Sequence, residues 1–134
     1  MRAVPLLLIV LAGCPLPDDG NCQVDDDCSG SKVCARNGDC LAASDVRAIR
    51  VTWTIRGQPA SAATCGTSPN FYILFASHDF NDSYGYEPVP CVSGVFSVDK
   101  LPTKYYSVEI GADGRFSQEA VFDSQGHASF DLTP

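Results

Sequence analysis

Short runs in which apolar and polar residues alternate recur about every ten residues between positions 45 and 134. In residues 49–55 the apolar side chains occupy every second position, which places them on one face of a β-strand. Residues 71–75 are almost continuously apolar, which predicts a central strand covered on both faces. Apolar residues at the spacing of a helix face are missing from this region, so we expect almost no helix.

Glycine and proline separate the alternating runs, as they do at turns between strands. About seven strands in about 90 residues predict an all-β fold, a β-sandwich of antiparallel strands over residues 45–134. The expected strands are 49–55, 71–75, 86–91, 95–98, 105–110, 118–122 and 128–132.

The first residues have a different pattern. Arg2 precedes about ten apolar residues, which is the order of a secretory signal and is too short to span a bilayer of about 30 Å. We therefore expect residues 1–13 to be removed as a signal peptide. An ordinary signal peptide, cut without lipid attachment, is the alternative, and it would leave Cys14 as an odd thiol.

The tetrad Leu11-Ala12-Gly13-Cys14 resembles the signal of bacterial lipoproteins. The resemblance implies that the Cys14 sulfur carries a diacylglycerol and that residues 14–21 form a lipidated stem. Several acyl chains, such as palmitate, at about 0.8 kcal/mol per buried methylene would keep the protein on a membrane. Pro15 stands where inner-membrane lipoproteins of enteric bacteria typically have Asp. The resemblance therefore points to the outer membrane of a bacterial cell envelope.

Six cysteines remain after Cys14, an even number that is typical of disulfides in an oxidising compartment. Four of them follow one another at intervals of six in residues 22–41, where so few apolar residues lie that covalent bridges must replace a core. Four cysteines allow three pairings. A zinc site is disfavoured, because zinc ligands usually come in pairs two to four residues apart. The six are Cys22, Cys28, Cys34, Cys40, Cys65 and Cys91.

Residues 22–40, with Asp-Asp before Cys28 and Asn37-Gly38 before Cys40, resemble the Dickkopf amino-terminal cysteine-rich region. The resemblance implies bonds from Cys22 to Cys34 and from Cys28 to Cys40. The two distant cysteines, Cys65 and Cys91, then form a third disulfide, which we expect to be a structural staple because they lack the spacing of a redox pair.

Residues 94–108 carry Gly94, Phe96, Leu101-Pro102 and a Tyr at 105 in the order that is typical of prealbumin-like domains. This group includes the Cna-B and carboxypeptidase-regulatory modules. The resemblance implies a β-sandwich of that kind, although Thr103-Lys104 replaces the usual glycine before the tyrosine.

Composition and charge exclude several functions. Sixteen acidic residues against nine basic ones give a net charge of −7, which disfavours nucleic acid as a partner. The chain has two histidines, His78 and His127. His78 lies between Ser77 and Asp79, and side chains of adjacent residues diverge in an extended strand, so a catalytic triad is not expected. We predict no catalytic residue, cofactor or metal.

Residues 79–87 begin like a calcium loop, with Asp79, Asn81 and Ser83 at alternate positions. The sixth position holds Tyr84 in place of glycine and the twelfth holds Pro90 in place of glutamate, so the motif fails. The same stretch has three aromatic residues among polar ones, a composition that suits contact with a sugar or a protein. The alternative is that they pack on their own sandwich. These candidate binding residues are Phe80, Tyr84 and Tyr86.

These observations favour a non-enzymatic, membrane-anchored envelope lipoprotein that presents a β-sandwich to a protein or a glycan. The alternative is a regulatory or accessory module of an envelope hydrolase, or a small hydrolase itself.

Overall fold

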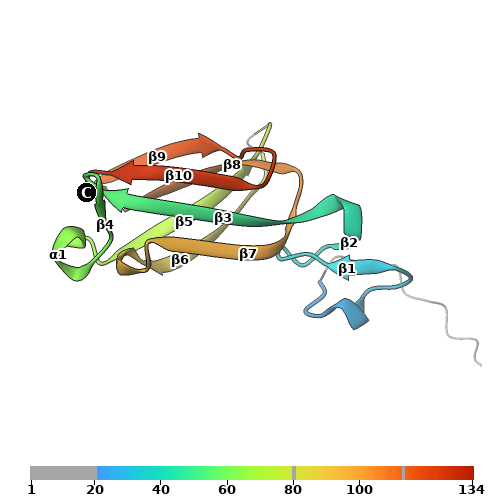
Figure 1. The fold of residues 1–134 in the computed structure, drawn as a ribbon. Helices are drawn as coiled ribbons and strands as arrows, with labels where there is room; N and C mark the ends of the chain where they lie inside the picture. The colour runs from blue at the N-terminus through green and yellow to red at the C-terminus, as the bar shows by residue number, and fades with distance from the viewer. Residues whose placement is uncertain (1–20, 80, 113) are drawn as a thin grey trace, which may run out of the picture.

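The computed structural model describes residues 21–79, 81–112 and 114–134. A small disulfide-rich segment lies at one end of a β-sandwich, and the C-terminus lies at the other end (Figure 1). The predicted all-β fold is confirmed. We call residues 22–42 the disulfide segment.

Two sheets form the sandwich, one with the order β6-β5-β8-β9 and the other with β3 between β10 and β7. Each of the seven strands expected from the sequence overlaps one in the structure. The elements are β3 (Val46–Ile55), β4 (Gln58–Pro59), α1 (Ala62–Cys65), β5 (Asn70–Ser77), β6 (Ser83–Pro90), η3 (Cys91–Ser93), β7 (Val95–Pro102), β8 (Tyr105–Ala112), β9 (Phe116–Val121) and β10 (His127–Leu132).

One strand pair departs from the antiparallel prediction. β10 runs parallel to β3, with His127 beside Arg50 and Leu132 beside Ile55. The chain crosses from one sheet to the other between β9 and β10, so these two consecutive strands do not form a hairpin. Gly126 makes this crossing possible: its φ is +80°, and a Cβ there would lie 2.6 Å from the carbonyl oxygen of Ala48.

The core lies between the sheets and is built from the inward positions of each strand. Phe75 of β5 is fully buried, and its ring lies 6.1 to 6.5 Å from those of Tyr86, Phe96 and Phe122. The outward residues of β5 are half-exposed. β5 is therefore central in its sheet as predicted, but it is covered on one face only, because none of the described residues forms a third layer over that sheet (Figure 1).

Trp53 connects the core to the third disulfide. Its indole N–H donates a hydrogen bond of 2.8 Å to the carbonyl oxygen of Cys91, which is fully buried. The Cys65–Cys91 bond joins the end of α1 to the turn η3. α1 was not expected from the sequence; Ser61 caps it by accepting a 3.2 Å hydrogen bond from the backbone N–H of Thr64.

The disulfide segment has little core of its own. A 3₁₀ turn, η1 (Asp25–Asp27), precedes a two-stranded hairpin of β1 (Lys32–Cys34) and β2 (Cys40–Ala42). The disulfides join Cys22 to Cys34 and Cys28 to Cys40, the pairing that the Dickkopf resemblance implies.

Replacement of Phe75 with alanine tests the core. We expect Phe75→Ala to lower the free energy of unfolding by about 3–5 kcal/mol, because it removes a buried ring and leaves a cavity. Val121, which is 65% exposed, provides the control. Val121→Ala should change the stability by less than about 0.5 kcal/mol. Denaturant unfolding of both variants measures the difference, and equal losses would contradict the position of the core.

Candidate functional site

Two of the residues predicted to have a function, Cys14 and Phe80, lie outside the described residues. In the part of the chain that the structure describes, no helix is long and apolar enough to cross a membrane.

Tyr84 and Tyr86 lie on strand β6, which begins at Ser83 and so starts three residues before the strand expected at residues 86–91. Their partners across the hairpin are Phe75 and Ile73, so both rings face the core side of the sheet. The ring of Tyr86 lies 4.9 Å from that of Phe96, and burial raises its pKa.

Both tyrosine side chains are half-buried and close the edge of the core between β6 and β7. A partner could contact only the part of each ring that stays exposed. A role for Tyr84 and Tyr86 in binding stays a prediction.

Ser77, His78 and Asp79 do not form a relay. Ser77, the last residue of β5, is buried, and His78 in the turn after it is exposed. The Ser77 hydroxyl donates to an Asp79 carboxylate oxygen at 2.6 Å, while the His78 ring stacks on that of Tyr106 with 3.8 Å between centroids. The imidazole therefore does not face the hydroxyl whose proton a triad would transfer.

The carboxylates of the β5–β6 turn bind donors of the protein itself. Asp79 accepts hydrogen bonds from the Ser77 hydroxyl and from the backbone N–H of Asn81, and these bonds lower its pKa. Asp82 pairs with Lys104 at 2.5 Å and accepts a hydrogen bond from Tyr105, and its pKa is lowered chiefly by Lys104. Calcium binding by this turn would have to displace these donors.

These residues surround a shallow hollow of about 450 Å³ at the end of the sandwich near the disulfide segment. Its walls carry both acidic and basic groups, already paired with one another. It is lined by Ser77, His78, Asp79, Asp82 and Lys104.

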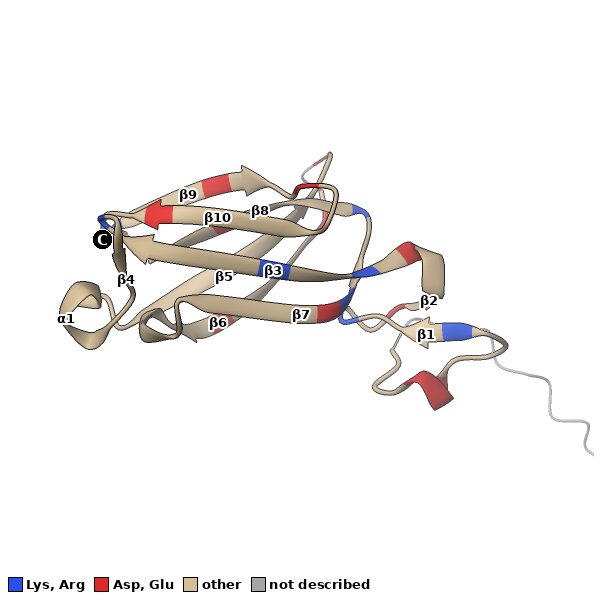
Figure 2. Cartoon of the chain, in the orientation of Figure 1, with Lys and Arg blue, Asp and Glu red and all other residues tan. Residues whose placement is uncertain are grey.

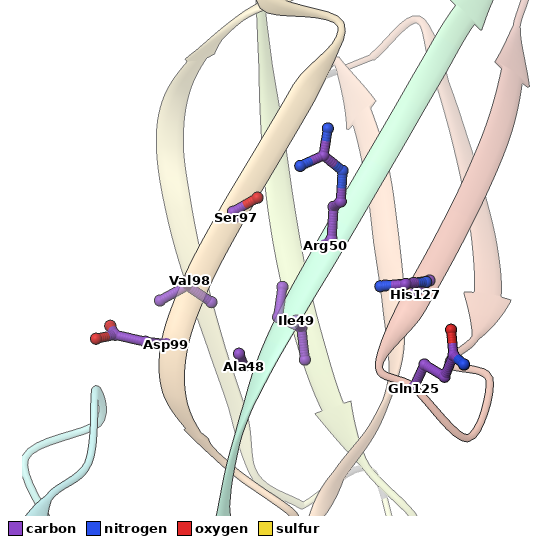
Figure 3. Close-up of a pocket in the computed structure, with 8 residues that line it drawn as sticks. All are labelled: Ala48, Ile49, Arg50, Ser97, Val98, Asp99, Gln125 and His127. Carbon is purple, nitrogen blue, oxygen red and sulfur yellow. The ribbon is translucent and has the colours of Figure 1, made fainter.

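A second hollow, of about 350 Å³, lies on the outer face of the sheet that contains β3 (Figure 3). Arg50 of β3 lines it, with Ser97 of β7 on one side and His127 of β10 on the other in the register of the sheet. Nothing in the amino-acid sequence indicated this grouping, because the three residues come from strands far apart in the chain. We call it the sheet hollow; it is lined by Ala48, Ile49, Arg50, Ser97, Val98, Asp99, Gln125 and His127.

The two histidines lie on different sheets: His78 follows β5, and His127 begins β10. They therefore offer no shared metal site. Three cysteine sulfurs of the disulfide segment, those of Cys22, Cys28 and Cys40, lie within 4.8 Å of one another. All three are in disulfides, so they present no thiolate to a zinc ion.

Ion pairs join the disulfide segment to the sandwich at the end of β7 and in the turn after it. Lys100 pairs with Asp25 at 2.7 Å, and Arg36 pairs with Asp99. Lys104 lies 3.7 Å from a carboxylate oxygen of Asp39, in addition to its bond with Asp82.

A backbone hydrogen bond adds to this contact: the N–H of Arg36 donates to the carbonyl oxygen of Lys100 at 3.1 Å. Asp25, the first of three consecutive aspartates, therefore has a docking role that we did not predict from the sequence. The opposite charge of Lys100, distant in sequence, was the only signal.

No protein-family model, curated protein or solved structure matches this chain.

The ion pairs predict how the contact between the two parts depends on pH. The pKa of Asp25 is lowered from 3.8 chiefly by Lys100, and that of Asp99 is lowered chiefly by Arg36. Because the folded pKa values are below the unfolded ones, the stabilisation is complete above pH 3.8 and is lost as the pH falls through the folded values.

We therefore expect the disulfide segment to become more mobile relative to the sandwich when the pH falls from about 6 to about 3, while its disulfides stay intact. Backbone ¹⁵N relaxation at Arg36 and Val108 measures this change. Arg36→Gln should show part of the same mobility at neutral pH. Unchanged relaxation at Arg36 across the pH range would contradict the docking role of the ion pairs.

Proposed function

We propose that this chain is a lipid-anchored protein of a bacterial envelope, in which Cys14 holds the molecule on a membrane and the β-sandwich presents a non-enzymatic binding surface to a protein or glycan. The outer membrane fits the proposal better than the inner one, because Pro15 follows Cys14.

The pairing of the cysteines supports this proposal most strongly. The chain has seven cysteines, and six of them form three disulfides with one another. Cys14 is the one that remains, and it is also the last residue of Leu-Ala-Gly-Cys. Disulfides are typical of compartments outside the cytoplasm, where lipoproteins reside. The odd cysteine and the lipoprotein signal therefore coincide at one position.

The described structure suits a membrane-proximal module. Residues 15–21 could extend at most about 25 Å, which keeps the disulfide segment near the surface that holds the lipid. The ion pairs at Asp25 and Arg36 join that segment to the end of β7. The sandwich would therefore project from the membrane with α1 and the C-terminus at its far end (Figure 1).

The proposal includes the resemblances of two parts of the chain to known families. The Cys22–Cys34 and Cys28–Cys40 bonds support a Dickkopf-like segment. The two-sheet sandwich supports a prealbumin-like module, in which the Leu101-Pro102 signature ends β7.

Lipid attachment is tested by expressing the full chain in a Gram-negative host with labelled palmitate. We expect the wild-type protein to incorporate label, to partition into detergent and to begin at a modified Cys14 in mass spectrometry. Cys14→Ser should incorporate no label and should not begin at residue 14, because the acylated sulfur is missing.

Cys65→Ser with Cys91→Ser is the control, because it also replaces cysteines, those of the third disulfide, but should keep the label. A wild-type protein that retains Met1, or that begins at an unmodified residue, would overturn the anchor.

A further inference from the structure

The basic side chains of the described residues have partners, with one exception. Eight of the nine lysines and arginines lie in the described part of the chain, since Arg2 does not. Six of these eight make side-chain hydrogen bonds or ion pairs within the protein, and Lys32 also has an interaction within it. Among the lysines and arginines of the described residues, Arg50 alone has no such side-chain interaction. In an acidic chain, a basic group without a partner marks a place where an external anion meets little competition from the protein's own carboxylates.

Arg50 lines the sheet hollow at the end that is uppermost in Figure 3. The period of β3 turns Ile49 and Val51 into the core, which forces Arg50 outward. Its cross-strand neighbours are Ser97 and His127, and directly opposed side chains in a sheet lie about 5 Å apart. Figure 3 shows Arg50 between β7 and β10, with the His127 ring extending toward β3.

Two aspartates near the hollow are occupied by other donors. Asp99 lines the hollow but pairs with Arg36. Asp123, 3.9 Å from the His127 ring, accepts hydrogen bonds from the backbone N–H groups of Gln125 and His127. Figure 2 shows a basic position in the middle of β3, with the acidic positions of β7 and β10 near the ends of those strands.

The remaining groups of the hollow match the chemistry of a sugar. A guanidinium binds a carboxylate through two parallel hydrogen bonds. Ser97, Gln125 and His127 offer a hydroxyl, an amide and an imidazole, which can donate to and accept from sugar hydroxyl groups. About 350 Å³ is at the small end of the range for ligand sites and is open to solvent, which suits one or two rings of a longer chain.

We infer that the sheet hollow binds an acidic glycan, with Arg50 receiving a sugar carboxylate and Ser97, Gln125 and His127 binding hydroxyl groups beside it. This inference rests on the proposed function and specifies it, because it names the class of partner that the sandwich would bind.

The test uses the full chain in detergent micelles and trigalacturonate as the probe, with neutral trigalactose beside it. We expect amide resonances of Arg50, Ser97 and His127 to shift in NMR titrations with the acidic sugar, and the shifts to saturate. The affinity should fall when the salt rises from about 0.05 to 0.5 M, because exposed charges are screened.

Arg50→Gln should weaken the binding of trigalacturonate by about tenfold or more, since it removes the positive charge and the two parallel hydrogen bonds of the guanidinium. Arg50→Lys should recover part of the affinity, because it keeps the positive charge but cannot make the two parallel hydrogen bonds of a guanidinium. Arg56→Gln is the matched control: it removes the same charge from an exposed arginine whose guanidinium donates to the Pro134 carbonyl oxygen. It should bind like the wild type.

Equal binding of trigalactose, equal binding by Arg50→Gln, or an absence of resonance shifts at millimolar sugar would each overturn the inference. A glutamate-rich peptide that binds at the same residues as tightly as the sugar would overturn the assignment to glycans. None of these results bears on lipid attachment at Cys14, so the inference can fail while the anchor is upheld.

Discussion

The alternation of side chains along β3 is the constraint on which the rest of the structure depends. Ile49, Val51, Trp53 and Ile55 must all face inward, because they supply one wall of the core. A shift of one residue in register would expose all four and bury the polar positions between them. Both β10 and β7 pair with this strand, so its register also sets theirs.

The same alternation creates the outer surface of that sheet. When Val51 points into the core, Arg50 must point to solvent, and the pairing of β3 then brings Ser97 and His127 beside it. The candidate glycan site is therefore a by-product of the register that builds the core. Its groups come from three strands and meet only because the first and last strands of the sandwich are parallel neighbours.

One kind of bond holds the disulfide segment together, and another attaches it to this framework. Covalent bonds hold the segment together, because its few apolar residues cannot form a core. Exposed ion pairs from Asp25 and Arg36 place it against the end of β7. Such pairs are individually weak, so they act together with the backbone hydrogen bond from Arg36 to Lys100. The third disulfide acts at the opposite end, near Trp53.

The amino-acid sequence by itself determined the fold class, the positions of the strands and the even set of six cysteines. The strands follow from the alternation of apolar and polar residues, which is a local property of each segment. The even number of cysteines after Cys14 follows from counting them. Tertiary structure decided what depends on contacts between distant residues: the parallel pairing of β3 and β10, the inward position of Tyr84 and Tyr86, the docking role of Asp25 and the partnerless state of Arg50. A side chain's partners are set by which strands become neighbours, and that choice is made by burial of the whole core rather than by any single segment.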